Sequence, residues 1–199
     1  MLKDRVQQIA RKVLEPLAGL LLRMGLTPNA LTMTGVVLSM GAGLAIIRGR
    51  LISAGILLLV GGLCDILDGS MARCGGSETL RGAFLDSTLD RVSEIAVFFG
   101  LLFYFRDSLA FQAWTFLALS GSLMTSYARA RAEGLGLSAK VGLLERPERV
   151  VLLIFALILN SWIVMGRGAI EWVIVLLAIF TWFTTMQRLV HVLIRNHDS

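Results

Sequence analysis

Long stretches without a charged residue recur along this chain of 199 residues, and they restrict its fold more than any other feature. Several of them alone reach the length of about 20 apolar residues that a helix needs to cross a hydrocarbon core about 30 Å thick. They do not alternate between polar and apolar residues as the strands of a membrane barrel do, so only helices can place them in a bilayer. A mean hydropathy of +0.75, far above that of soluble proteins, agrees with this.

We therefore predict an all-α integral membrane protein with six transmembrane helices. The spans are expected near residues 30–48, 51–73, 82–106, 109–133, 147–166 and 169–195. The segments between the spans are too short to bury a hydrophobic core of their own. We expect residues 25–199 to form a single six-helix membrane domain.

The first 24 residues differ from the rest, because basic and apolar residues are interleaved in them. This spacing places an apolar stripe opposite a basic face, which is typical of a helix that lies in the membrane interface. A secretory signal peptide is the alternative, but the charges run too far into the segment and no small-residue cleavage site follows a short apolar run. We predict an amphipathic interfacial helix over residues 1–24.

The basic residues are unequally distributed between the two sides that six spans define. With a cytoplasmic amino terminus, 15 of the 19 lysines and arginines fall on the inner side and the other four on the outer side. The positive-inside rule then places both termini and the aspartates described below at the cytoplasmic face of the cell membrane. The net charge of +5 favours anionic lipid and phosphate-bearing substrates, and nucleic acid is not expected as a partner.

Four aspartates lie where the second predicted span ends and the third begins. Asp65 and Asp68 are three residues apart, and Asp86 and Asp90 are four apart, so each pair projects from one face of a helix. Two such pairs facing each other would repel strongly in a poorly solvated site unless cations lay between them. The spacing therefore indicates a metal site. An all-carboxylate ligand set favours hard cations such as Mg²⁺ or Mn²⁺ over Zn²⁺.

The residues around these aspartates follow a longer pattern, Asp-x2-Asp-Gly-x2-Ala-Arg-x8-Gly-x3-Asp-x3-Asp. It is matched without a gap by eight residues, namely Asp65, Asp68, Gly69, Ala72, Arg73, Gly82, Asp86 and Asp90. This arrangement resembles the signature of the CDP-alcohol phosphotransferases. Members of that family transfer a phosphatidyl-type group from a CDP-linked lipid to the hydroxyl of an acceptor alcohol and release CMP.

The resemblance implies both a fold and a catalytic site. These enzymes are six-helix membrane proteins, commonly homodimers, with an interfacial helix at the amino terminus and a site near the cytoplasmic face. By that resemblance Asp65, Asp68, Asp86 and Asp90 hold two Mg²⁺ ions, with Mn²⁺ as the alternative ion. Asp90 also removes the proton of the acceptor hydroxyl. Two ions can bridge the diphosphate of CDP-diacylglycerol and offset charge on the departing CMP.

Residues near the aspartates are expected to bind the CDP-lipid. The candidates are Asn29, Thr32, Gly69, Ala72, Arg73, Thr79 and Gly82. The glycines and the alanine are small enough for a nucleotide to approach the helix backbones, and in the family that surface holds the cytidine. Arg73 and Thr79 are candidate donors to the nucleotide or its phosphates. Asn29 and Thr32 begin the first span, so their segment is equally a helix start with Pro28 in its first turn.

The second half of the chain carries arginines on three separate spans. Arg129 closes the fourth span, Arg149 opens the fifth, and Arg188 lies in the cytoplasmic part of the sixth. Convergent guanidinium groups can grip a phosphate bidentately, which favours an acceptor that itself carries a phosphate. The stretches resemble the branch of the family that makes phosphatidylinositol phosphate from CDP-diacylglycerol and inositol 3-phosphate, and by that resemblance the three arginines bind the acceptor phosphate. Anchoring of the span ends by snorkelling side chains is the alternative reading.

Other functions stay open on the sequence alone. Related enzymes accept glycerol 3-phosphate, and archaeal relatives use an ether-lipid donor. A cation transporter is the rival from another class, because intramembrane aspartates also mark ion pathways. The inverted repeats of many transporters are not apparent in the sequence. A binding protein with a degenerate enzyme site would be expected to have lost at least one aspartate.

Overall fold

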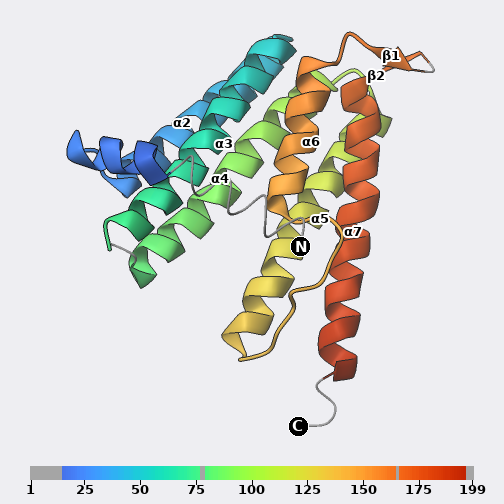
Figure 1. The fold of residues 1–199 in the computed structure, drawn as a ribbon. Helices are drawn as coiled ribbons and strands as arrows, with labels where there is room; N and C mark the ends of the chain where they lie inside the picture. Colours follow the sequence, from blue (N-terminus) through green and yellow to red (C-terminus); the bar gives the residue numbers. More distant parts are fainter. Residues whose placement is uncertain (1–14, 77–78, 165, 196–199) are drawn as a thin grey trace.

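The computed structural model describes residues 15–76, 79–164 and 166–195, and most of them are helical (Figure 1). The helices are α2 (Pro28–Ile47), α3 (Leu51–Cys74), α4 (Leu80–Tyr104), α5 (Leu109–Gly134), α6 (Arg146–Ile158) and α7 (Ala169–Arg195). Two strands of two residues each, β1 (Ile163–Val164) and β2 (Arg167–Gly168), pair antiparallel between α6 and α7. The predicted all-helical class is confirmed.

Two helices that carry candidate site residues begin with a threonine cap. The side chain of Thr27 accepts a hydrogen bond from the backbone N–H of Ala30 at 3.2 Å, at the start of α2. Thr79 accepts one from the N–H of Gly82 at 3.0 Å, at the start of α4. Pro28 occupies the first turn of α2, where its missing N–H removes no helical hydrogen bond. The helix-start reading of this segment is therefore confirmed, and Thr79 also has a capping role.

The helices form one bundle in which α2 packs against both α3 and α4. Glycines permit the closest approach: a Cβ atom built at Gly100 of α4 would lie 2.5 Å from the carbonyl oxygen of Gly43 on α2. On the other side of the bundle α5 packs against α7, and α6 lies against α3 and α7. The buried core joins the two sides, with Phe98, Leu157 and Ile174 among its members.

A polar seam holds α5 against α7. The hydroxyl of Thr125 donates to the carbonyl oxygen of Thr181 at 2.9 Å, and the indole N–H of Trp182 donates to the carbonyl oxygen of Leu117 at 3.1 Å. Hydrogen bonds between threonines and neighbouring helix backbones are a common way to join helices where no water is available. The seam positions the part of α7 that carries Arg188 against the end of α5 that carries Arg129.

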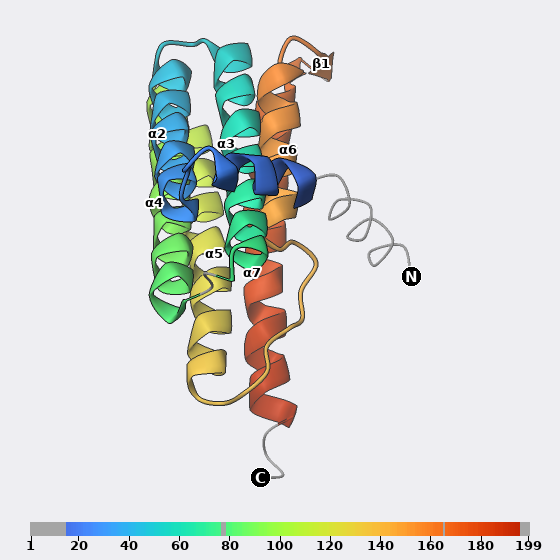
Figure 2. The ribbon, with the colours of Figure 1, turned by 60° about the vertical axis from the view of Figure 1, so that its left-hand side comes forward.

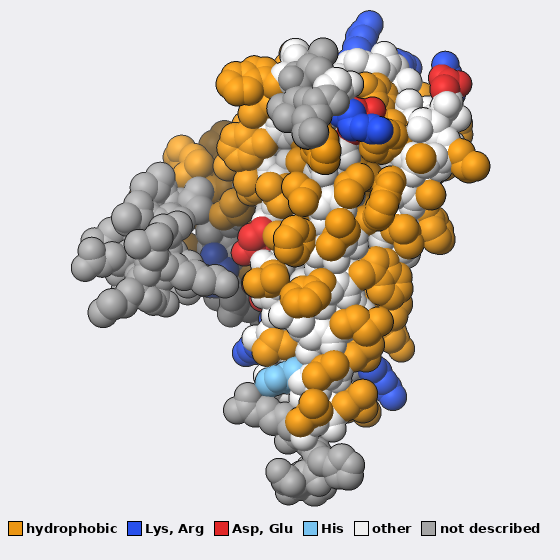
Figure 3. All heavy atoms as spheres, turned by 90° about the vertical axis from the view of Figure 1, so that its right-hand side faces the viewer, with side chains coloured by type: hydrophobic (Ala, Val, Ile, Leu, Met, Phe, Trp, Pro, Cys, Tyr) orange, Lys and Arg blue, Asp and Glu red, His pale blue; other side chains and the backbone are white. Residues whose placement is uncertain are grey.

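Large apolar side chains cover much of the outer surface of the bundle, and Figure 3 shows them over the face on the α7 side. By length and hydropathy three of the described helices can cross a bilayer, at Pro28–Ile47, Leu51–Cys74 and Ala169–Ile194. A soluble protein rarely exposes apolar surface on this scale. The chain is therefore a membrane protein.

The fifth predicted span differs most from the structure. It was expected at 147–166, whereas α6 ends at Ile158 and the chain turns back through β1 and β2. The side-chain oxygen of Asn160 accepts a hydrogen bond from the backbone N–H of Ile170 at 3.1 Å, which ties this turn to the start of α7. Hydropathy does not register the turn, because apolar residues follow it directly.

The predicted interfacial helix over residues 1–24 lies partly outside the described residues, which begin at residue 15. Residues 15–23 are helical, and this helix runs across the bundle at a large angle to the long helices (Figure 2). Such a direction suits a segment that lies in the membrane plane while the bundle crosses it. The interfacial position itself stays a prediction.

Candidate active site

Three of the four predicted aspartates come together between α3 and α4. Asp65 and Asp68 of α3 and Asp86 of α4 each offer one carboxylate oxygen, and these three oxygens lie within 4.8 Å of one another. Asp68 is buried, and its Oδ2 accepts a hydrogen bond from the hydroxyl of Thr32 on α2 at 2.5 Å. The helical spacing of three and four residues is what brings these side chains to facing surfaces.

The cluster fits a hard divalent cation. Its donors are carboxylate oxygens, the ligands that Mg²⁺ and Mn²⁺ prefer. Among the described residues, Oδ1 of Asp86 is buried and has no hydrogen-bond partner. A buried carboxylate oxygen without a protein donor is well explained as a metal ligand. These residues can therefore hold a metal ion.

Asp90, the fourth predicted aspartate, is held by an arginine. Its Oδ1 lies 2.6 Å from Nη2 of Arg146, and Nη1 of the same arginine lies 3.3 Å from Oδ2 of Asp65. The side chain of Asp90 is 15% exposed, so the pair lies at the edge of the buried region. One guanidinium thus links Asp90 to the carboxylate cluster. Arg146 was not among the predicted site residues.

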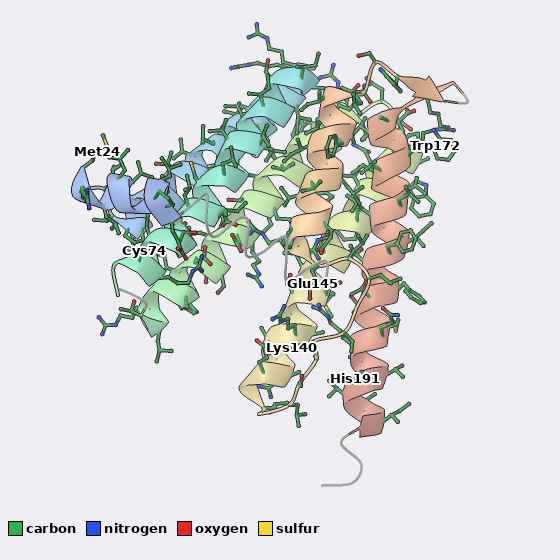
Figure 4. All side chains as sticks on the ribbon, viewed as in Figure 1. Met24, Cys74, Lys140, Glu145, Trp172 and His191 are labelled. Atoms are coloured by element: carbon green, nitrogen blue, oxygen red, sulfur yellow. The ribbon has the colours of Figure 1, made fainter. Side chains whose placement is uncertain are left out.

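The residues predicted to bind the CDP-lipid lie around the end of α3 and the starts of α2 and α4. Cys74 marks that end of α3 in Figure 4. Arg73 donates to the hydroxyl of Ser70 at 3.1 Å and is itself exposed. A Cβ atom built at Gly69 would meet only the end of the Arg73 side chain, at 3.5 Å. Thr32 contacts the cluster directly through Asp68, whereas Asn29 is exposed at the start of α2.

A cavity with about 680 Å³ of empty space, including its open mouth, extends from the aspartates between α2, α3, α4 and α6. Asp65, Asp90 and Arg146 line its polar part, whereas apolar side chains such as Leu58 and Phe98 line the rest. A cavity with charged and apolar parts suits a ligand that has a phosphate and a hydrocarbon portion.

The three predicted arginines come from α5, α6 and α7 and lie close enough for Arg188 to interact electrostatically with both Arg129 and Arg149. Arg188 is 3% exposed and donates to the carbonyl oxygens of Val141 at 2.8 Å and Thr125 at 2.6 Å. Both acceptors are neutral, so its charge is not cancelled by a direct ion pair among the described residues. Arg188 thus lies within electrostatic range of the other two arginines, and the binding of an acceptor phosphate by the three stays a prediction.

The other two arginines have carboxylate partners. The side chain of Arg129 is 39% exposed and lies 3.0 Å from Glu133 and 3.8 Å from Glu145, which precedes α6 in Figure 4. Arg149 is 1% exposed, and its Nε lies 3.3 Å from Glu94 of α4. Burial of this degree excludes snorkelling as the explanation for Arg149 and Arg188.

Arg146 and Glu94 are two residues of this region that the sequence does not mark as candidates. The one available signal for Glu94 is its place four residues after Asp90, which puts it on the same face of α4. Arg146 stands three residues before Arg149, on the same face of the predicted fifth span. Neither position reveals its partner, because each partner lies on a different helix.

Residues 25–190 match the family described as CDP-alcohol phosphatidyltransferase. The chain is 36% identical over 187 residues to an archaetidylinositol phosphate synthase from Pyrococcus horikoshii, covering 93% of each chain. It is 37% identical over 186 residues to a phosphatidylinositol phosphate synthase from Mycobacteroides abscessus, covering 89% of this chain and 82% of that one.

Two solved structures of the phosphatidylinositol phosphate synthase from Mycobacterium tuberculosis are similar to this one. The structure with CDP-DAG bound superimposes with a TM-score of 0.83 at 34% identity, over 92% of this chain and 94% of that chain. The structure in complex with manganese and citrate gives a TM-score of 0.82 at 35% identity, over 91% of this chain and 89% of that chain. The family match over residues 25–190 includes the three clustered aspartates, the residues that line the cavity, and Arg129, Arg149 and Arg188.

Proposed function

The chain belongs to the CDP-alcohol phosphatidyltransferase family, and from this premise we propose that it transfers the phosphatidyl group of CDP-diacylglycerol to a hydroxyl of inositol 3-phosphate and releases CMP. The observation that carries the proposal is a single cavity whose lining combines Asp65 and Asp90, next to the carboxylate cluster, with the buried Arg149. The names of the similar enzymes, which include phosphatidylinositol phosphate and archaetidylinositol phosphate synthases, support an inositol phosphate as the acceptor.

In this proposal Asp65, Asp68, Asp86 and Asp90 hold two divalent ions, Mg²⁺ by preference and Mn²⁺ as the alternative. The manganese complex of the similar mycobacterial enzyme supports a divalent ion in the family. Bound there, the ions would offset the charge that develops on the diphosphate as CMP leaves. One oxygen from each of Asp65, Asp68 and Asp86 lies within 4.8 Å of the other two, and the hydroxyl of Thr32 donates a hydrogen bond to Asp68.

Asp90 is proposed as the general base. Its carboxylate takes the proton of the acceptor hydroxyl while that oxygen forms a bond to the lipid-bearing phosphorus. The bond from this phosphorus to the CMP oxygen breaks, and CMP departs with the bonding electrons. Arg146 orients the base through its 2.6 Å contact with Oδ1, and the other carboxylate oxygen, Oδ2, lies 4.0 Å from Nη1 of Arg91.

The donor nucleotide is proposed to lie along the ends of α2, α3 and α4. The residues assigned to it are Asn29, Thr32, Gly69, Ala72, Arg73, Thr79 and Gly82. Only the flexible end of Arg73 lies near Gly69, so a nucleotide can approach the α3 backbone there when that side chain moves. The CDP-DAG complex of the similar enzyme supports this class of donor.

Arg129, Arg149 and Arg188 are proposed to bind the acceptor phosphate. The support is their convergence from three helices and the low exposure of Arg149 and Arg188, 1% and 3%. Guanidinium groups held by a buried framework lose little entropy when they bind a phosphate. A neutral acceptor would not balance this buried positive charge.

One observation favours a second donor. The archaeal relative named archaetidylinositol phosphate synthase matches this chain over 93% of its length, no less completely than the bacterial relatives do. An ether-linked CDP-lipid is therefore the alternative donor, with the same head-group chemistry.

We also propose six transmembrane helices, with α4, α5 and α6 completing the three that satisfy the length and hydropathy criteria, and with the active site toward the cytoplasm. The positive charge of the predicted inner side supports that orientation. We propose a homodimer and an interfacial helix over residues 1–24 from the family resemblance. Residues 25–199 would then be one membrane domain.

The test is CMP release from CDP-diacylglycerol by the purified protein in Mg²⁺, with inositol 3-phosphate, glycerol 3-phosphate, free inositol or serine as the acceptor. We expect release with inositol 3-phosphate and little with the two acceptors that lack a phosphate. An ether-linked CDP-lipid is run in parallel to compare donors. Preference for free inositol or serine would contradict the acceptor assignment, and no release with any acceptor would contradict the reaction.

A further inference from the structure

Helices α4 and α6 face each other across the cavity, and two arginine–carboxylate pairs join them there. Arg146 pairs with Asp90, and one turn further along both helices Arg149 pairs with Glu94. The spacing of three residues on α6 and four on α4 keeps both pairs on the facing sides. The first pair belongs to the catalytic site described above. The second contains a carboxylate, that of Glu94, to which no role has been given.

The Arg149–Glu94 pair is the more deeply buried of the two. Its side chains are 2% and 8% exposed, against 26% and 15% for Arg146 and Asp90. The free-energy cost of burying two charges is offset only when the geometry of the pair is good and the remaining hydrogen-bond donors are satisfied. Among the described residues, however, Nη2 of Arg149 is buried and has no hydrogen-bond partner. A pair that served the fold alone would not be expected to leave a charged donor unsatisfied.

The partners of Arg149 determine which edge of its guanidinium group stays open. Nε donates to Oε1 of Glu94 at 3.3 Å, and Nη1 donates to the carbonyl oxygen of Leu144 at 3.3 Å. Nη2 is the remaining nitrogen, and Arg149 lines the cavity. Because the guanidinium group is planar, two nitrogens held by the protein fix the direction of the third.

We propose that Glu94 is a positioning residue that orients Arg149 so that its Nη2 is presented to the phosphate of the acceptor. This inference rests on the proposed function, because Arg149 is one of the three arginines assigned to that phosphate. Glu94 touches no reacting atom and acts through Arg149. Its negative charge also keeps a buried guanidinium in place between turnovers, when no phosphate balances it.

The test is the substitution Glu94→Gln, which keeps the size of the side chain and removes its charge. We expect the KM for inositol 3-phosphate to rise by about tenfold to a hundredfold. This is the loss of affinity expected when a charge-assisted hydrogen bond to the phosphate is weakened. The KM for CDP-diacylglycerol should stay within about twofold of the wild-type value. Glu94→Asp, which retains the charge on a shorter side chain, should give an intermediate acceptor KM.

The matched control is Glu148→Gln. Glu148 precedes Arg149 on α6 and is exposed, so the same chemical change there should leave both KM values unaltered. A double variant, Glu94→Gln with Arg149→Gln, separates action through Arg149 from an independent effect. We expect it to be no worse than Arg149→Gln alone, because two residues that act as one unit are not additive. If the increases in acceptor KM of the two single variants multiply in the double variant, the proposal is overturned.

A purely structural role for Glu94 predicts a different result. It would lower the thermal unfolding midpoint and raise the two KM values together, and an equal rise in both would overturn the proposal. If Glu94→Gln does not fold, Glu94→Asp decides, and an unchanged acceptor KM in that variant would also overturn it. Failure of the wild-type protein to use inositol 3-phosphate contradicts the proposed function instead, and that result is obtained before any variant is made.

Discussion

At the scale of single residues, the relation between Asp90 and Arg146 decides how the proposed reaction can begin. A general base must reach the acceptor hydroxyl while holding one rotamer. Arg146 contacts Asp90 at 2.6 Å and Asp65 at 3.3 Å, so one planar group aligns the base with the carboxylate cluster. We therefore assign a positioning role to Arg146, which joins Asp65 of α3 to Asp90 of α4.

Replacing Asp90 with Asn tests the role of the base. Asn keeps the volume of the side chain but cannot accept the proton, so we expect turnover in the CMP-release assay to fall by at least about a hundredfold. Asp107→Asn is the control, because the Asp107 side chain is 92% exposed in the turn before α5. Near-normal turnover by the Asp90→Asn variant would refute its assignment as base.

The residues that sequence reasoning found and missed differ in one physical respect. Asp65, Asp68, Asp86 and Asp90 could be predicted because their spacing along two helices repeats the helical period. The partners Arg146 and Glu94 are defined by contacts between helices, and neither their sequence position nor their type reveals those contacts. The approach of Arg129, Arg149 and Arg188 could be predicted because all three stand at the cytoplasmic side of their predicted spans, and their assignment to a phosphate follows from that approach and from the family resemblance.

At the scale of elements, the close contact between α2 and α4 positions the helix that carries two of the four candidate carboxylates. Gly43 and Gly100 let the two backbones touch, and α4 carries Asp86 and Asp90 from that contact to the cluster. The packing of α2 against α3 brings Thr32 of α2 to Asp68 of α3. Small residues at helix crossings have this effect because nothing but hydrogen lies between the chains.

A methyl group at this contact should therefore be costly. In Gly100→Ala the new Cβ atom would lie 2.5 Å from the carbonyl oxygen of Gly43, so the helices must separate. We expect a loss of about 1–3 kcal/mol in the free energy of unfolding, measured as a lower thermal midpoint in detergent. The control is Gly62→Ala on α3, where no atom lies within 4 Å of the added group. Equal midpoints for the two variants would contradict the proposed contact.

The elements themselves could largely be predicted from the apolar stretches. Helices α2, α3, α4, α5 and α7 agree with the predicted spans to within a few residues. The end of α6 could not be predicted, because the turn at Asn160 depends on its hydrogen bond to the next helix, whereas the residues after it are apolar. Hydropathy measures local composition. It does not detect a hydrogen bond to another helix that ends the first helix.

At the scale of the whole molecule, the proposed orientation places the aspartates toward the cytoplasm. The turn at Asp107, between α4 and α5, would then face the outside. The exposed residue Cys74 ends α3 near the aspartates and provides a natural label on the inner side, once the half-buried Cys64 is replaced by alanine. Cys74 and Asp107 lie at opposite ends of the bundle.

A membrane-impermeant maleimide tests this orientation in intact cells. We expect Cys74 to react only after the membrane is permeabilised, because the positive-inside rule places its end of the bundle in the cytoplasm. A cysteine introduced by Asp107→Cys, in a chain without the two native cysteines, should react in intact cells. Labelling of Cys74 from outside would reverse the proposed topology.

The central claim is that carboxylates from α3 and α4 hold divalent ions against the diphosphate of a CDP-lipid. Anomalous diffraction from crystals grown with Mn²⁺ and CDP-diacylglycerol measures this directly, because the anomalous scattering of manganese is much stronger than that of the phosphorus atoms of the lipid. We predict peaks among Asp65, Asp68, Asp86 and Asp90, with the diphosphate beside them. Well-ordered donor with no anomalous peak among these carboxylates would contradict the account.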